Sequence, residues 1–199
     1  MRIGIFGGSF NPIHYGHLIL AETARTGFNL DKVIFMPAGR PPHKPDMRLA
    51  DDWQRLKMVK LAIAGNPAFE ASDYELKKHG LSYTYDTLKY FSRHFKKGAK
   101  LFFIMGIDLL MQINTWKKSE GLLDLCAFLV GTRPNFPASS IPKNTRSRVE
   151  IFKIPLLDIS GTYIRKAIRE KKSIKYLVPE KVEDFILRNK LYVSDKRAG

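Results

Sequence analysis

The sequence contains a single cysteine, Cys126, so a disulfide-stabilised fold is excluded. Long hydrophobic runs are also missing, because Asp108 and Asp124 interrupt the two apolar stretches well short of membrane-spanning length. The N-terminus has no extended hydrophobic region followed by a small-residue cleavage site. We therefore expect a cytoplasmic protein that does not associate with membranes, with Cys126 as a buried, unreactive thiol.

Acidic residues are scarce relative to basic ones. The 199 residues include 34 Lys and Arg against 19 Asp and Glu, a formal net charge of +15 at pH 7. Residues 143–199 alone hold 15 basic and seven acidic residues. Such an excess predicts either anionic partners, such as nucleic acid or small phosphorylated molecules, or a solvated basic surface. Charge alone does not choose between them.

Short apolar runs alternate with segments of helical spacing along the chain. Strands are predicted over 2–6, 32–36, 101–105 and 127–130, with a weaker one over 151–154, and helices over 18–28, 50–64, 85–95, 162–170 and 180–190. This alternation predicts an α/β fold, a Rossmann-like doubly wound and mainly parallel sheet with helices on both faces. We expect one domain over 1–199, closed by a small C-terminal helical part over 160–199. Proline-rich residues 37–45 predict an exposed irregular loop, and residues 134–148 a mobile surface loop.

Gly7 and Gly8 lie where the first strand ends and the first helix begins, the edge at which parallel sheets bind ligands. Because they lack side chains, a phosphate chain can approach the backbone there, and the start of the following helix also favours anions. His14 and His17 are three residues apart, so both imidazoles can donate hydrogen bonds to one triphosphate. The plain alternative is an ordinary helix start.

Two other site chemistries are disfavoured by the same segment. Zinc requires three or four ligands at closed spacing, and no cysteine or carboxylate lies near the two histidines. A dinucleotide-binding loop requires G-x-G-x-x-G, which is absent here. A nucleic-acid-binding module, suggested by the charge, would need a groove-reading helix or an aromatic stacking sheet, and neither motif is present. Nucleic acid is therefore not the expected partner.

The segment GGSFNPIHYGHL, residues 7–18, resembles the (H/T)xGH signature of the nucleotidylyltransferase superfamily, with His14, Gly16 and His17 at the signature positions. Residues 159–165, ISGTYIR, are similar to its second signature, ISSTxIR. Alone, this second segment would indicate only a capped helix start, in which Ser160 and Thr162 can cap the helix. Two signatures in the right order near opposite ends of the chain together indicate a member of the superfamily.

Further segments narrow the resemblance to the bacterial nicotinate mononucleotide adenylyltransferases. They are residues 41–44 (PPHK), 82–87 (SYTYDT) and 105–108 (MGID), Trp116, Arg133 with Pro134, and residues 176–179 (YLVP). The resemblance implies that nicotinate mononucleotide binds at Thr84, Tyr85, Trp116 and Arg133. The backbone at Thr84 and Tyr85 would receive the nicotinate carboxylate, and Trp116 would stack on the pyridine ring. The plain alternatives are a helix cap and a core tryptophan.

The same resemblance implies the ATP site and the chemistry. The catalytic residues would be His14, His17, Lys44 and Arg165, and ATP would also contact Gly7, Gly8, Ser9, Phe10, Gly16, Gly106, Asp108, Ser160 and Thr162. The acceptor phosphate would attack ATP in line, without a covalent enzyme intermediate, and catalysis would come from positioning and charge neutralisation. Magnesium would be carried mainly by the ATP phosphates, with no metal site on the protein. Self-association stays open.

Two positions depart from the resembled pattern, and two acceptors compete with nicotinate mononucleotide. Family members commonly carry Asp where this chain has Asn11, and Ser where it has Gly161. The first change keeps a hydrogen-bond acceptor, whereas the second removes a hydroxyl that could contact phosphate. Phosphopantetheine has no aromatic carboxylate for Trp116 and residues 82–87 to hold. Nicotinamide mononucleotide differs in one charged group and stays open as an acceptor.

Overall fold

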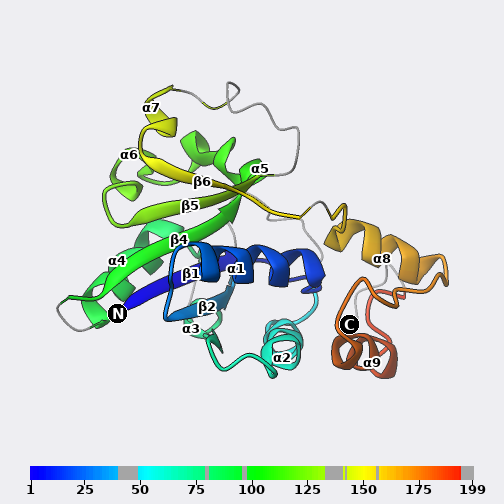
Figure 1. Cartoon of the computed structure of the whole chain (residues 1–199). Coiled ribbons are helices and arrows are strands. Elements are labelled where there is room, and N and C mark those ends of the chain that lie inside the picture. The colour runs from blue at the N-terminus through cyan, green and yellow to red at the C-terminus, as the bar shows by residue number, and fades with distance from the viewer. Residues whose placement is uncertain are drawn as a thin grey trace.

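The computed structural model describes residues 1–39, 49–78, 81–95, 98–132, 141, 143–155 and 157–193. Within these ranges six parallel strands form one sheet in the order β3-β2-β1-β4-β5-β6 (Figure 1). The strands are β1 Arg2–Gly8, β2 Lys32–Pro37, β3 Phe69–Ala71, β4 Lys100–Gly106, β5 Ala127–Thr132 and β6 Val149–Lys153. The helices are α1 Tyr15–Gly27, α2 Asp52–Ile63, α3 Tyr74–Lys77, α4 Thr84–His94, α5 Ile107–Leu110, α6 Ser119–Leu122, α7 Lys143–Arg146, α8 Gly161–Arg169 and α9 Glu180–Arg188, with a 3₁₀ turn η1 at Ile113–Thr115.

Alternating side chains on the central strands explain why helices cover both faces of the sheet. On β2, Val33 and Phe35 belong to one buried cluster, and Ile34 and Met36 belong to a second cluster. Successive residues of a strand point to opposite faces, so each strand contributes to two cores. The first cluster includes residues of α1, α2, α8 and α9, and the second includes residues of α4, α5, η1 and α6. The predicted α/β fold with a parallel sheet is confirmed.

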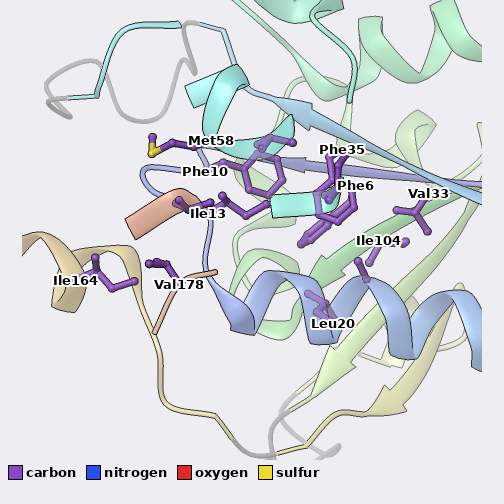
Figure 2. Packing of buried hydrophobic residues seen from close by; sticks show 14 of the residues in the cluster. Phe6, Phe10, Ile13, Leu20, Val33, Phe35, Met58, Ile104, Ile164 and Val178 are labelled. Carbon is purple, nitrogen blue, oxygen red and sulfur yellow. The ribbon is translucent and has the colours of Figure 1, made fainter. Parts of the chain in front are cut away.

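The C-terminal helices α8 and α9 pack next to α2 and the start of α1, beyond the ends of the central strands (Figure 1). Ile164 of α8 and Val178 lie in the same buried cluster as Phe10 and Ile13 (Figure 2). The Tyr15 N–H at the start of α1 donates to the Leu177 carbonyl at 3.1 Å. The C-terminal part therefore shares a core with one face of the sheet. The single domain over 1–199 stays a prediction.

Three local expectations were wrong. The first helix begins at Tyr15 rather than at Leu18, so its first turn includes His17. Pro37 is the last residue of β2 and is buried, so the proline-rich loop does not start there; its residues 40–45 lie outside the described part of the chain. Within the expected mobile loop 134–148, residues 143–146 form the short helix α7, which contacts β6; residues 134–140 and 142 lie outside the described part of the chain. No helix in the described ranges is long and apolar enough to cross a membrane.

Candidate active site

The sheet order places a topological switch point between β1 and β4, because the chain winds away from these two strands in opposite directions. Ligands of such sheets bind outside the carboxyl ends of the strands at this point. A cavity of about 520 Å³ opens there, which is in the size range of sites for small molecules. Gly7 and Gly8 from the end of β1 and Gly106 from the end of β4 line it. The fold therefore delivers the glycine turn to a ligand-sized cavity.

His14 and His17 lie together at the start of α1 and both line the cavity. His14 is the N-cap residue, and its backbone N–H donates to Nδ1 of His17 at 3.2 Å. The two ring centroids are 3.7 Å apart, and the edge of the Phe10 ring packs against His17. Because Nδ1 of His17 accepts a hydrogen bond, the neutral ring carries its proton on Nε2. Nε2 is then a hydrogen-bond donor for a ligand.

Burial keeps the histidine pair uncharged near neutral pH. It lowers the pKa of His14 to about 4. The pKa of His17 lies well below 6.5, first because of burial and second because of the neighbouring His14. Nδ1 of His14 has no hydrogen-bond partner within the described residues, although it is buried. The pair therefore offers N–H donors, and an anion placed beside it would favour protonation.

The second signature reaches the same cavity through the start of α8. Ser160 is the N-cap of α8, accepts a hydrogen bond from the Tyr163 N–H at 3.1 Å, and lines the cavity together with Gly161. Arg165 does not line it. However, a Cβ on Gly161 would lie 3.2 Å from Nη1 of Arg165, so the guanidinium lies next to this part of the wall.

Arg165 bonds to groups beside the cavity wall. Its Nη1 donates to the Asn11 carbonyl at 2.7 Å, and its Nη2 donates to Oγ1 of Thr162 at 3.3 Å. Thr162 is exposed and, like Arg165, lies outside the cavity lining. The structure thus brings the two signatures together, and Arg165 holds the first one by its backbone.

The opposite end of the cavity is formed by the start of α4 and by Trp116. Thr84 is the first residue of α4, and the N–H groups of Thr84 and Tyr85 have no acceptor within the described ranges. Both residues line the cavity with Trp116, whose ring packs edge-on against Phe103 with centroids 6.4 Å apart. Free N–H groups at a helix start suit a carboxylate, and an anchored indole suits a planar ring. This end of the cavity therefore suits a planar ring that carries a carboxylate.

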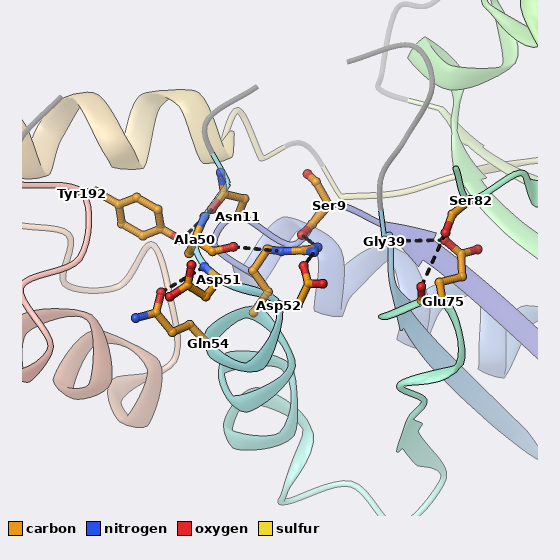
Figure 3. Close-up of polar contacts among 11 residues, drawn as sticks. Ser9, Asn11, Gly39, Ala50, Asp51, Asp52, Gln54, Glu75, Ser82 and Tyr192 are labelled. Atoms are coloured by element: carbon orange, nitrogen blue, oxygen red, sulfur yellow. Dashed lines mark hydrogen bonds and ion pairs between the residues drawn. The ribbon is translucent and has the colours of Figure 1, made fainter. Parts of the chain in front are cut away.

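Sequence reasoning missed Glu75, a buried carboxyl at the cavity. Its Oε2 accepts the Gly39 N–H at 3.4 Å (Figure 3). Its Oε1 accepts a hydrogen bond from the Thr87 hydroxyl at 2.7 Å. Burial raises the pKa of Glu75, opposed by the Thr87 hydrogen bond. A Cβ on Gly39 would lie 2.6 Å from the Ser82 hydroxyl, so only glycine fits there. Nothing in the local pattern marks Glu75, because its helix, α3, has only one turn.

Lys117 was also missed, although its position next to Trp116 could have indicated it. Its Nζ lies 4.2 Å from the centroid of the Tyr83 ring and 3.4 Å from Oδ2 of Asp86, and the residue lines the cavity. It supplies a positive charge at the end of the cavity formed by the start of α4 and Trp116.

The remaining predicted site residues divide into three groups. Ser9, Gly16 and Asp108 line the cavity. Phe10 does not, because its ring is fully buried in the core below, where a Cβ on Gly8 would lie 3.1 Å from it. Lys44 and Arg133 lie outside the described residues. No cluster of three or more metal-ligating His, Cys, Asp or Glu side chains is found within the described ranges.

The family model and the doubly wound fold together place the chain among the nucleotidyltransferases. A model of the cytidylyltransferase-like family matches residues 5–167. The solved structure of Plasmodium falciparum nicotinic acid mononucleotide adenylyltransferase complexed with NaAD superposes with a TM-score of 0.79 at 24% identity, covering 96% of this chain and 97% of that chain. At that identity the likeness shows the fold alone.

Sequence relatives give the narrower family. A probable nicotinate-nucleotide adenylyltransferase of Moorella thermoacetica is 46% identical over 96% of this chain and 91% of its own length. One from a Thermoanaerobacter species is 41% identical over 100% of this chain and 98% of its own length. The chain belongs to the nicotinate-nucleotide adenylyltransferase family, as its signatures predicted.

Proposed function

We propose that this chain transfers the adenylyl group of ATP to nicotinate mononucleotide, giving nicotinate adenine dinucleotide and pyrophosphate, a step of NAD biosynthesis. One observation carries the proposal. A single cavity at the switch point joins the histidine pair to the start of α4 and Trp116. Hydrogen-bond donors suited to phosphates and a binding site suited to an aromatic carboxylate thus lie in one cavity, as a reaction between these two substrates requires.

In the proposed reaction, a 5′-phosphate oxygen of nicotinate mononucleotide attacks the α-phosphorus of ATP. The new P–O bond forms as the bond from that phosphorus to the bridging oxygen of pyrophosphate breaks. The attacking oxygen is already ionised near neutral pH, so neither a protein nucleophile nor a strong base is needed. The protein would hold the two phosphates in line and stabilise the developing charge. His17 would do so through its Nε2–H, and His14 through a ring N–H.

Magnesium would enter with ATP. The phosphate end of the cavity offers N–H donors and glycine backbone rather than a cage of oxygen ligands, which fits an ion held mainly by phosphates and water. When bound, the ion would neutralise part of the phosphate charge. Roles for Arg165 at the ATP phosphates, for Lys44 at the acceptor phosphate and for Arg133 at nicotinate mononucleotide stay predictions, as does the cytoplasmic location.

A pyrophosphate-release assay with magnesium and ATP tests the function directly. The acceptors to compare are nicotinate mononucleotide, nicotinamide mononucleotide and phosphopantetheine. We expect the highest kcat/KM with nicotinate mononucleotide, because the free N–H groups of Thr84 and Tyr85 pair with a carboxylate better than with an amide. Preference for the amide would contradict the substrate assignment. If phosphopantetheine were the only one of the three acceptors that gave pyrophosphate release, the proposed transfer to nicotinate mononucleotide would be contradicted.

A further inference from the structure

We propose that the hydroxyl of Tyr192, close to the C-terminus, positions Arg165 for the ATP phosphates by holding Asn11. The proposal rests on the function proposed above. The Tyr192 hydroxyl donates to Oδ1 of Asn11 at 2.8 Å, across 181 residues of sequence (Figure 3). The Ala50 N–H, just before α2, donates to the same oxygen at 3.0 Å. Two segments that are distant in sequence thus donate hydrogen bonds to the side-chain oxygen of Asn11, a buried residue of the first signature.

The backbone carbonyl of Asn11 connects these hydrogen bonds to Arg165. Its carbonyl accepts the hydrogen bond from Nη1 of Arg165 at 2.7 Å, so one residue accepts from Tyr192 through its side chain and from Arg165 through its main chain. Asn11 is only 3% exposed, which leaves it little room to move. An arginine side chain has many rotamers, and fixed acceptors select one of them. Arg165 is therefore held next to the cavity wall at Gly161 before ATP binds.

Gly161 makes this arrangement possible. A Cβ at this position would lie 2.9 Å from the Asn11 carbonyl oxygen and 3.2 Å from Nη1 of Arg165. The first distance is too short for a carbon and a backbone oxygen, so any larger residue would shift the carbonyl that Arg165 uses. The two positions that depart from the resembled family pattern, Asn11 and Gly161, are thus in contact. They act together on the same guanidinium.

The local structure at Tyr192 fits a dedicated contact. Its backbone φ is 64°, in the left-handed region that residues with side chains seldom adopt. Leu191 beside it is buried, and the Tyr192 ring packs against the same core cluster. Burial raises the pKa of the Tyr192 phenol, so the hydroxyl keeps its proton near neutral pH and can donate.

A double-mutant cycle tests whether Tyr192 acts through Arg165. The variants are Tyr192→Phe, Arg165→Ala and both together, with Tyr176→Phe as a matched control, since Tyr176 is 79% exposed in the same part of the chain. We expect Tyr192→Phe to lower kcat/KM for ATP by about 3- to 10-fold, the effect of one lost hydrogen bond. In the Arg165→Ala background the same change should have no further effect. Tyr176→Phe should match the parent.

The same cycle is measured on the affinity for magnesium-ATP by calorimetry, without an acceptor. If Tyr192→Phe lowered the affinity for magnesium-ATP equally in both backgrounds, or did not lower it in the parent background, the proposal would be overturned. Gly161→Ala provides a second approach to the same carbonyl, and it should also lose its effect in the Arg165→Ala background. If the parent binds ATP but releases no pyrophosphate with nicotinate mononucleotide, the proposed function fails while the binding cycle still decides this inference. If the parent binds no ATP, both fail.

Discussion

His17 can act at a phosphate only with its proton on Nε2, and one backbone contact determines this. The His14 N–H donates to Nδ1 of His17, which fixes the tautomer without a carboxylate partner. We predict that His17→Ala lowers kcat/KM by about 100-fold or more, on the order of 3 kcal/mol of transition-state stabilisation. Steady-state pyrophosphate release with saturating magnesium measures it.

His94→Ala is the matched control for this change. His94 is exposed on α4 and does not line the cavity, so its removal should leave turnover at the parental value. Thermal unfolding of both variants separates a loss of chemistry from a loss of folded protein. Turnover of His17→Ala within a few-fold of the parent would show that the histidine pair is not the phosphate site.

His14 also makes the stability of the protein depend on pH. Its pKa is about 4 in the folded chain and about 6.5 when unfolded, so between these values the unfolded chain binds more protons. The free energy of unfolding should therefore fall as the pH falls from about 6.5 to about 4. Between pH 7 and pH 5, His14 alone should account for a loss of about 2 kcal/mol.

Urea unfolding of the parent and of His14→Asn at both pH values tests this. The variant should lose less stability on acidification than the parent, by roughly that amount. His94→Asn, which changes an exposed histidine, should keep the parental pH dependence. An unchanged dependence in His14→Asn would mean that His14 is not buried as described.

At the scale of elements, the proposed function places the nicotinate carboxylate at the backbone N–H groups that begin α4. Proline fits the first position of a helix and removes an N–H that the helix itself does not use. Thr84→Pro should therefore fold normally and raise KM for nicotinate mononucleotide several-fold, with KM for ATP unchanged. It should also lower the ratio of kcat/KM for nicotinate mononucleotide to kcat/KM for nicotinamide mononucleotide. Kinetics with both acceptors measure this.

Thr84→Ala is the control, because it removes the side chain and keeps the N–H. It should resemble the parent in both acceptors. If Thr84→Ala were as impaired as Thr84→Pro, the threonine hydroxyl and not the backbone would bind the acceptor. If neither variant changed KM, the nicotinate group would bind elsewhere.

Elements with a clear period were predictable, and single turns were not. The strands β1, β2, β4 and β5 and the helices α1, α2, α4, α8 and α9 were predicted to within a few residues, because each strand is a short apolar run and each helix buries an apolar set at helical spacing. By contrast, β3 has three residues and α3, α5, α6 and α7 have four each, too few to show a period. Glu75 was missed with α3 for this reason.

The signatures predicted that two distant segments meet at one cavity, but neither which of their side chains line it nor how they are held. Gly7, His14, His17 and Ser160 line one cavity, as two signatures at one sheet edge imply. Nothing in the sequence pattern indicated a structural role for Arg55, although it is fully buried and donates to the Ser9 carbonyl at 3.0 Å. Such contacts depend on side chains from distant segments, and local spacing does not encode them.

At the scale of the whole molecule, the two tryptophans report on opposite faces of the sheet. Trp53 of α2 packs edge-on against Phe185 of α9, with centroids 6.0 Å apart, and Trp116 lines the cavity on the other side. Trp116→Phe leaves only the first reporter, and Trp53→Phe leaves only the second. The fluorescence of each single-tryptophan protein then follows unfolding on one face.

Ile186 of α9 is fully buried in the core shared with the sheet, so Ile186→Ala should cost about 2–5 kcal/mol. If residues 1–199 form one domain, both reporters should show the same lowered midpoint in urea, because a single cooperative unit unfolds at once. Leu187→Ala, at a neighbouring residue that is 58% exposed, should stay within about 0.5 kcal/mol of the parent. If the midpoint fell only for the Trp53 reporter, residues 160–199 would unfold separately. The hydrogen bond from Tyr192 to Asn11 would then form only while residues 160–199 stay packed against the rest of the chain.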